Sequence, residues 1–203
     1  MRPFVPVAAA LSLGVLVGCA SMTPTTEREE SYAIYHVTPT DTITTRDLSD
    51  AIVTGLQNHM SEVRVDNRIP PSPLPDEPAR FRLVDPFQGS NLGALAAASG
   101  GAFRVPSCDQ AVMTVNADDR SMNQYGENTT FFLCLQPYKA GYHIDIYVAF
   151  SKKSGAVTPA LLGATLARNV LGDSSQFLPR TIEGVVDEVK KTGAEVTLVE
   201  AYP

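Results

Sequence analysis

The sequence predicts an α+β domain in which a mostly antiparallel sheet carries helices packed on one face. Residues 129–136 and 141–150 are rich in β-branched and aromatic side chains and flank a turn that contains glycine, and the second of these segments alternates apolar and polar side chains, which is typical of a β-hairpin. Apolar residues recur at helical spacing in residues 44–60, 158–172 and 179–193. A hydrophobic fraction of 44% and a charged fraction of 19% are ordinary for a folded protein, so we expect a single core.

The first part of the predicted domain contains a strand, a helix and a second strand. Residues 31–37 are rich in β-branched and aromatic side chains, which favours a strand. Thr44 and Asp47 match a capping box, so a helix should begin there. Residues 62–66 then predict a short strand. The apolar stripe of the helix is Leu48, Ile52, Leu56 and Met60.

A proline-rich segment and two weaker strands follow. Residues 69–78 can join neither a helix nor a central strand, so they predict a stiff surface loop. This loop is a plain connector or, alternatively, a docking ligand for an aromatic groove on a partner. Residues 79–84 predict a strand with Phe81 and Leu83 inward. Residues 89–101 are rich in glycine and alanine but lack a phosphate-binding fingerprint, so we assign no nucleotide site.

The hairpin carries the strongest strand pattern, after a half-buried strand predicted over residues 110–117. Residues 137–141 should form a five-residue turn. Alternate side chains of the second hairpin strand should face the core: Tyr142, Ile144, Ile146, Val148 and Phe150. The side chains between them should face solvent: His143, Asp145 and Tyr147.

Two helices and a last strand complete the predicted domain. The first helix begins at Thr158 and Pro159, with the stripe Leu161, Leu162, Leu166 and Val170. The second begins at Pro179 and ends before Gly193, with the stripe Ile182, Val185, Val186 and Val189. Residues 195–201 predict a final strand. We expect both stripes to cover the inward face of the hairpin, because each surface is apolar on one side only.

The N-terminus has the three parts of a secretory signal. Met1 and Arg2 supply the positive start, residues 4–17 the apolar run, and Gly18 the small residue before cleavage. The run is too short to span a bilayer as a mature helix. Residues 16–19, Leu-Val-Gly-Cys, resemble the lipobox of bacterial lipoproteins, in which the cysteine is lipidated and becomes the mature N-terminus.

The resemblance implies that Cys19 carries two or three acyl chains such as palmitate, enough to hold a protein stably to a membrane. It also implies an outer-membrane location facing the periplasm, because Ala20 rather than Asp follows the cysteine. The alternatives are an ordinary signal peptide or a cytosolic helix, but residues 4–17 lack the polar face of such a helix. The expected organisation is a signal peptide (1–18), a lipid-anchored flexible tether (19–31) and one domain (32–203) that includes the loop 69–78.

The chain has three cysteines, and if Cys19 is lipidated only Cys108 and Cys134 keep their thiols. Two thiols in an oxidising compartment usually pair, so we expect a disulfide. Closing a loop of about 26 residues contributes roughly 3 kcal/mol in the chain-entropy model. Two separately buried thiols and a metal site remain alternatives, although no Cys-x-x-Cys or paired histidines accompany the cysteines.

The inventory of reactive groups is small. A net charge of -6 with no basic run argues against nucleic acid as a partner. The histidines lie in separate elements, so we assign no metal and no cofactor. His143 and Asp145 could form an acid–base pair on one strand face. We favour a solvated strand face for these two residues and assign no catalytic residue.

The sequence therefore favours a lipid-anchored, non-catalytic envelope protein that binds another envelope protein, as an interaction or assembly subunit. The alternative is a periplasmic small-ligand-binding or hydrolytic lipoprotein with a pocket between the helices and the sheet. A grooved apolar surface would support the first function, and an enclosed pocket with converging polar groups would support the second.

Overall fold

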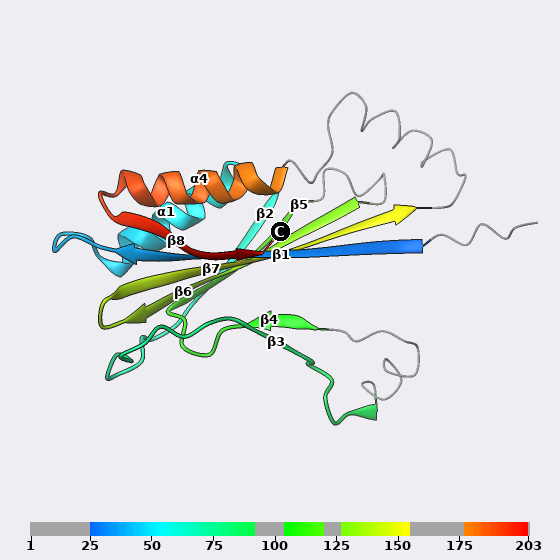
Figure 1. Ribbon diagram of the computed structural model, residues 1–203, viewed down its shortest axis with the longest axis horizontal. Coiled ribbons are helices and arrows are strands. Elements are labelled where there is room, and N and C mark those ends of the chain that lie inside the picture. Colours follow the sequence, from blue (N-terminus) through cyan, green and yellow to red (C-terminus); the bar gives the residue numbers. More distant parts are fainter. Residues whose placement is uncertain (1–24, 92–103, 120–126, 155–176, 203) are drawn as a thin grey trace, which may run out of the picture.

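Six strands form one sheet in the order β2-β5-β6-β7-β1-β8, and β3 and β4 pair separately (Figure 1). The computed structural model describes residues 25–91, 104–119, 127–154 and 177–202. Every neighbouring pair in the six-stranded sheet is antiparallel, as predicted. In chain order the elements are β1 (Thr25–Thr38), α1 (Thr45–Gln57), β2 (Glu62–Asn67), β3 (Arg82–Val84), β4 (Val105–Ser107), β5 (Met113–Asp119), β6 (Glu127–Tyr138), β7 (Gly141–Ser154), α4 (Phe177–Lys191) and β8 (Glu195–Tyr202).

Helix α1 begins where the capping box predicts. The side-chain oxygen of Thr44 accepts a hydrogen bond from the backbone N–H of Asp47 at 3.2 Å, and the Asp47 carboxylate accepts one from the backbone N–H of Thr44 at 2.8 Å. Leu48, Ile52 and Leu56 are buried. The prediction of this helix and of its first three stripe residues is confirmed, whereas Met60, also buried, lies beyond the helix end at Gln57.

Helices α1 and α4 lie side by side on one face of the sheet (Figure 1). The predicted stripe of α4 is buried at Val185, Val186 and Val189. Val185 and Val189 share one core with the inward residues of the hairpin, Ile144, Ile146 and Val148, as expected. The predicted helix over residues 158–172 lies outside the described residues, so its packing stays a prediction.

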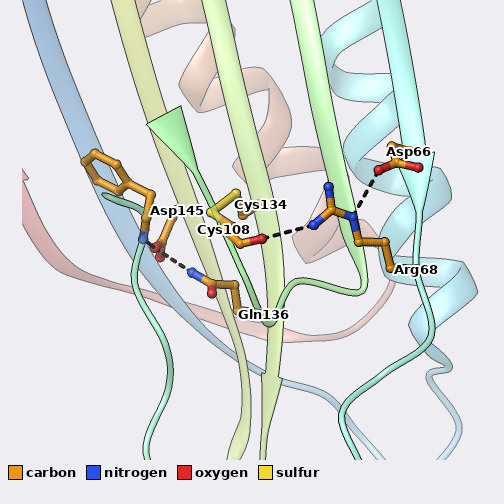
Figure 2. The surroundings of a disulfide bond; sticks show 7 residues. Asp66, Arg68, Cys108, Cys134, Gln136 and Asp145 are labelled. Atoms are coloured by element: carbon orange, nitrogen blue, oxygen red, sulfur yellow. Dashed lines mark hydrogen bonds and ion pairs between the residues drawn. A yellow bond between two sulfur atoms is a disulfide. The ribbon is translucent and has the colours of Figure 1, made fainter. Parts of the chain in front are cut away.

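A thin second layer covers the opposite face of the sheet. We call this layer the cover and define it as residues 68–91 and 104–111, which include the β3–β4 pair (Figure 1). The disulfide between Cys108 and Cys134, present as predicted, joins the cover to β6 (Figure 2). A small apolar cluster around this disulfide includes Ala111, Phe132 and Tyr147. The sheet is therefore enclosed on two sides.

The cover overturns one prediction about the hairpin. His143, Asp145 and Tyr147 should face solvent according to the alternation of β7, yet they are only 8%, 1% and 4% exposed. The alternation correctly placed them on the face away from the helices. It could not show that a segment far away in the sequence lies over that face.

Three boundaries also differ from the predictions. Residues 25–31 of the expected tether belong to β1 and pair with β7, because backbone pairing needs no apolar side chains. The hairpin turn is tighter than five residues, since Tyr138 pairs with Gly141. Gly141 has a φ of +139°, which favours glycine at this position. The strand expected over residues 79–84 is reduced to the three residues of β3.

The two helices meet at a glycine. A β-carbon on Gly55 would lie 2.6 Å from the Cα atom of Val185, which is closer than carbon atoms normally approach. We therefore expect Gly55→Ala to destabilise the domain by about 1–3 kcal/mol, even though alanine favours a helix by about 1 kcal/mol over glycine. Urea unfolding measures the change. Thr54→Ala, on the exposed side of α1, is the control and should change stability by less than about 0.5 kcal/mol. A more stable Gly55→Ala variant would contradict the close packing.

Candidate functional site

Three polar side chains lie together on the covered face of β6 and β7. Gln136 is opposite His143 in the strand register, and Asp145 follows two residues along β7 on the same face. Asp145 Oδ2 accepts hydrogen bonds from the backbone N–H of Phe81 and from Gln136 Nε2, both at 2.7 Å (Figure 2). Phe81 belongs to the cover. The carboxyl group of Asp145 therefore ties the cover to the sheet.

This cluster is not fully satisfied. Gln136 Oε1, His143 Nδ1 and Asp145 Oδ1 are buried and have no hydrogen-bond partner within the described part of the chain. Such atoms cost about 1–3 kcal/mol each when they lose water without a replacement. The covered face thus combines this costly polar cluster with the apolar cluster around the disulfide, whereas the face beneath the helices is an apolar core.

Burial controls the ionisation of both titratable members of the cluster. It raises the pKa of Asp145 from 3.8 to about 6, against the opposing effects of the Phe81 N–H group, the charge of Arg80 and the Gln136 amide. It also lowers the pKa of His143, and the charges of His36 and Arg80 lower that pKa further. Both groups are therefore driven toward their uncharged forms.

His36 of β1 extends the polar row to the next strand. His36 Nδ1 is hydrogen-bonded to the hydroxyl group of Tyr138 at 2.8 Å, and His36 Nε2 to that of Thr38 at 2.9 Å. The ring centroid of His143 lies 6.0 Å from that of His36 and 5.4 Å from that of Tyr138. This arrangement does not support His143 and Asp145 as an acid–base pair, because both side chains are buried under the cover. The geometry gives Asp145 a role in holding the cover.

A second feature is open to solvent. A groove of about 770 Å³ lies between α4 and the sheet, where β1, β7 and β8 extend beside the first turns of the helix. Aromatic and aliphatic side chains make up much of its wall, and the exposed carboxylates of Glu29, Glu30 and Glu183 also line it. The groove is lined by Glu29, Glu30, Ser31, Tyr32, Ala33, Tyr35, Val148, Phe150, Pro179, Ile182, Glu183, Ala201 and Tyr202.

The groove adjoins an exposed apolar edge of the sheet. Leu198, Val199 and Tyr202 of β8 are 58%, 54% and 58% exposed. The β1–β8 register shifts between Ile34 and Tyr35, so that Val199 has no partner in the ladder. Such a bulge makes it harder for a further strand to pair with the free edge of β8. The side chains of Leu198, Val199 and Tyr202 remain exposed beside it.

The sequence contained a partial signal for this surface. Leu198 and Val199 are consecutive apolar residues, which a strand with one buried face cannot both bury. Tyr32, Tyr35 and Tyr202 gave no sign of meeting at one groove, because the groove is built from four elements. No pattern within a single element could identify it.

The other predicted site residues divide into two groups. Cys108 and Cys134 form the disulfide, which excludes the alternatives of free thiols and a metal site for this pair. Cys19 lies outside the described residues, so its lipidation stays a prediction. In the part of the chain that the structure describes, no three His, Cys, Asp or Glu side chains gather as metal ligands, and no helix is long and apolar enough to cross a membrane.

The raised pKa of Asp145 predicts a pH-dependent stability. A carboxyl group that is harder to ionise in the folded state stabilises the fold at low pH and loses this contribution as pH rises from about 4 to about 6. A change from 3.8 to about 6 corresponds to about 3 kcal/mol. Asp145→Asn cannot ionise, so its stability relative to the wild type should increase by about this amount between pH 4 and pH 7.

Urea unfolding with the disulfide intact measures this difference at each pH. The control is Asp47→Asn, because its hydrogen bonds from Thr44 lower the pKa of Asp47 and give it the opposite dependence. The Asp47 variant should lose stability relative to the wild type as pH rises through 4. A stability difference between wild type and Asp145→Asn that is the same at pH 4 and pH 7 would contradict the interpretation.

Comparisons with known proteins do not assign this arrangement to a family. No protein-family model matches the chain, and no curated protein or solved structure is significantly similar to it.

Proposed function

We propose that this protein is a lipid-anchored lipoprotein of the cell envelope that binds another envelope protein, as a non-catalytic interaction or assembly subunit. The Leu-Val-Gly-Cys sequence at residues 16–19 supports the anchor. The observation that carries the binding function is the exposed apolar edge of β8 beside the groove. The outer membrane, with the domain in the periplasm, is the proposed location because Ala20 follows Cys19.

The form of the surface favours a protein partner. Exposed apolar side chains that adjoin a groove are typical of protein-interaction sites, whereas small ligands are usually enclosed by their pockets. Leu198 and Val199 stand outside the groove and would gain contacts only from a partner that extends over the sheet edge.

A small-ligand-binding or hydrolytic lipoprotein is the second candidate. A volume of about 770 Å³ between helix and sheet is within the range of ligand sites, and it supports this alternative. A hydrolytic function has less support, because His143 and Asp145 are buried and do not line the groove.

Cross-linking followed by purification from solubilised membranes tests the binding function. We expect the wild-type protein to retain a defined envelope protein, and Leu198→Ser with Val199→Ser to retain at least tenfold less. The matched control is Ile69→Ser, because Ile69 is 92% exposed on the proline-rich loop and lies outside this surface. Equal recovery of the same partner by all three proteins would remove β8 from the binding surface, and no specific partner for the wild type would contradict the function.

Lipidation is tested by Cys19→Ser. This variant should not incorporate a labelled fatty acid and should leave the membrane fraction, because without acyl chains the domain has no stable anchor. Metabolic labelling and membrane fractionation measure the two effects. Incorporation at the wild-type level would refute the lipobox interpretation. Cys108→Ser with Cys134→Ser, which removes the two disulfide cysteines, should still be labelled.

A further inference from the structure

The outer side of β1 is only partly covered by β8. Strand β8 ends at Tyr202, which is opposite Tyr32, and its pairing with β1 covers Tyr32 to Thr38. Residues 25–31 of β1 continue past this end and pair with β7 on their other side. Among the described residues, no strand lies on the outer side of this segment. Its alternate backbone N–H and C=O groups on that side therefore have no partner strand within the described part of the sheet, as at an edge.

The groove lies against this same open segment. Glu29, Glu30 and Ser31 line it from β1, and Ala201 and Tyr202 line it from the end of β8. An added strand that continued the line of β8 would therefore lie along the groove. Alternate side chains of such a strand would point to one face of the sheet, toward the apolar groove wall formed by Ile182, Val148 and Phe150.

The charged side chains near residues 25–31 indicate which charge a partner segment should carry. Glu30 already has an ion pair with Arg28, at 2.9 Å. Glu29 and Glu183 are exposed and have no cationic partner among the described residues. Opposite charges on adjacent strands are favourable and like charges are unfavourable. A second copy pairing through the same segment would bring acidic side chains together, which opposes self-association.

We infer that residues 25–31 of β1 and the adjoining groove receive an extended segment of a partner protein, with alternating apolar and basic side chains, as an added antiparallel strand. Backbone hydrogen bonds to β1 provide part of the affinity, and the groove and carboxylates select the side chains. This inference rests on the proposed binding function and names the kind of partner.

The test uses full-length protein purified in detergent and a fluorescent peptide of seven alternating Lys and Val residues. We expect fluorescence anisotropy to show saturable binding that weakens with salt, because the charges are exposed. A matching Glu and Val peptide should bind at least tenfold more weakly. A Lys and Val peptide with methylated backbone nitrogens should also bind at least tenfold more weakly, because it cannot donate the hydrogen bonds of an added strand.

Variants identify the site. Glu29→Lys with Glu183→Lys should weaken binding of the Lys and Val peptide at least tenfold. The control Glu77→Lys, an exposed charge on the proline-rich loop, should not change it. Circular dichroism and a thermal melt should show the same fold for all three proteins. Equal binding of the methylated peptide, or equal binding by the double variant, would overturn the inference.

The inference and the proposed function can fail separately. If Glu29→Lys with Glu183→Lys still recovers the wild-type partner from membranes, the binding function stands and the inference of an added strand is wrong. If no partner is recovered by the wild type, the function fails whatever the peptide shows.

Discussion

The whole fold depends on the fact that β7 is buried on both faces. Ile144, Ile146 and Val148 lie under the helices, and His143 and Asp145 lie under the cover. Neither face of this strand is exposed to water, so a different part of the chain must cover each face. The helices cover one face through an apolar core. The cover is too thin to build a comparable core, and it depends on specific attachments.

Those attachments are of different kinds and lie along the length of the cover. The disulfide of Cys108 fixes one end covalently, and Arg68 lies between Asp66 and the backbone carbonyl of Cys108, with hydrogen bonds of 3.0 and 3.2 Å (Figure 2). The Asp145 carboxyl group holds the middle of the cover by accepting a hydrogen bond from the backbone N–H of Phe81. The Phe81 ring packs on both Tyr32 and Tyr147, with ring centroids 5.5 and 5.7 Å apart. A disulfide, a few hydrogen bonds and aromatic contacts thus hold the cover, whereas a large apolar core holds the helices.

The sequence predicted the features that depend on local pattern or on inventory. The capping box at Thr44, the stripe of α4 and the pairing of the last two cysteines are of this kind. The burial of Asp145 could not be predicted, because it depends on Phe81, which is far away in the sequence, and the strand predicted over residues 79–84 gave no sign of lying over β7. The pairing of residues 25–31 was missed because a polar segment can form a strand through its backbone alone. The groove was missed because its walls come from four elements.

If the chain is anchored at Cys19, the early start of β1 limits the distance between the domain and the membrane. If Cys19 carries the acyl chains, the chain has six residue steps to reach Thr25, which span at most about 20 Å even when fully extended. A long tether would let the domain search a wide volume of the periplasm. This short one would keep the open segment of β1, which follows it directly, close to the lipid surface. The candidate partners would then be proteins embedded in the same membrane or held next to it.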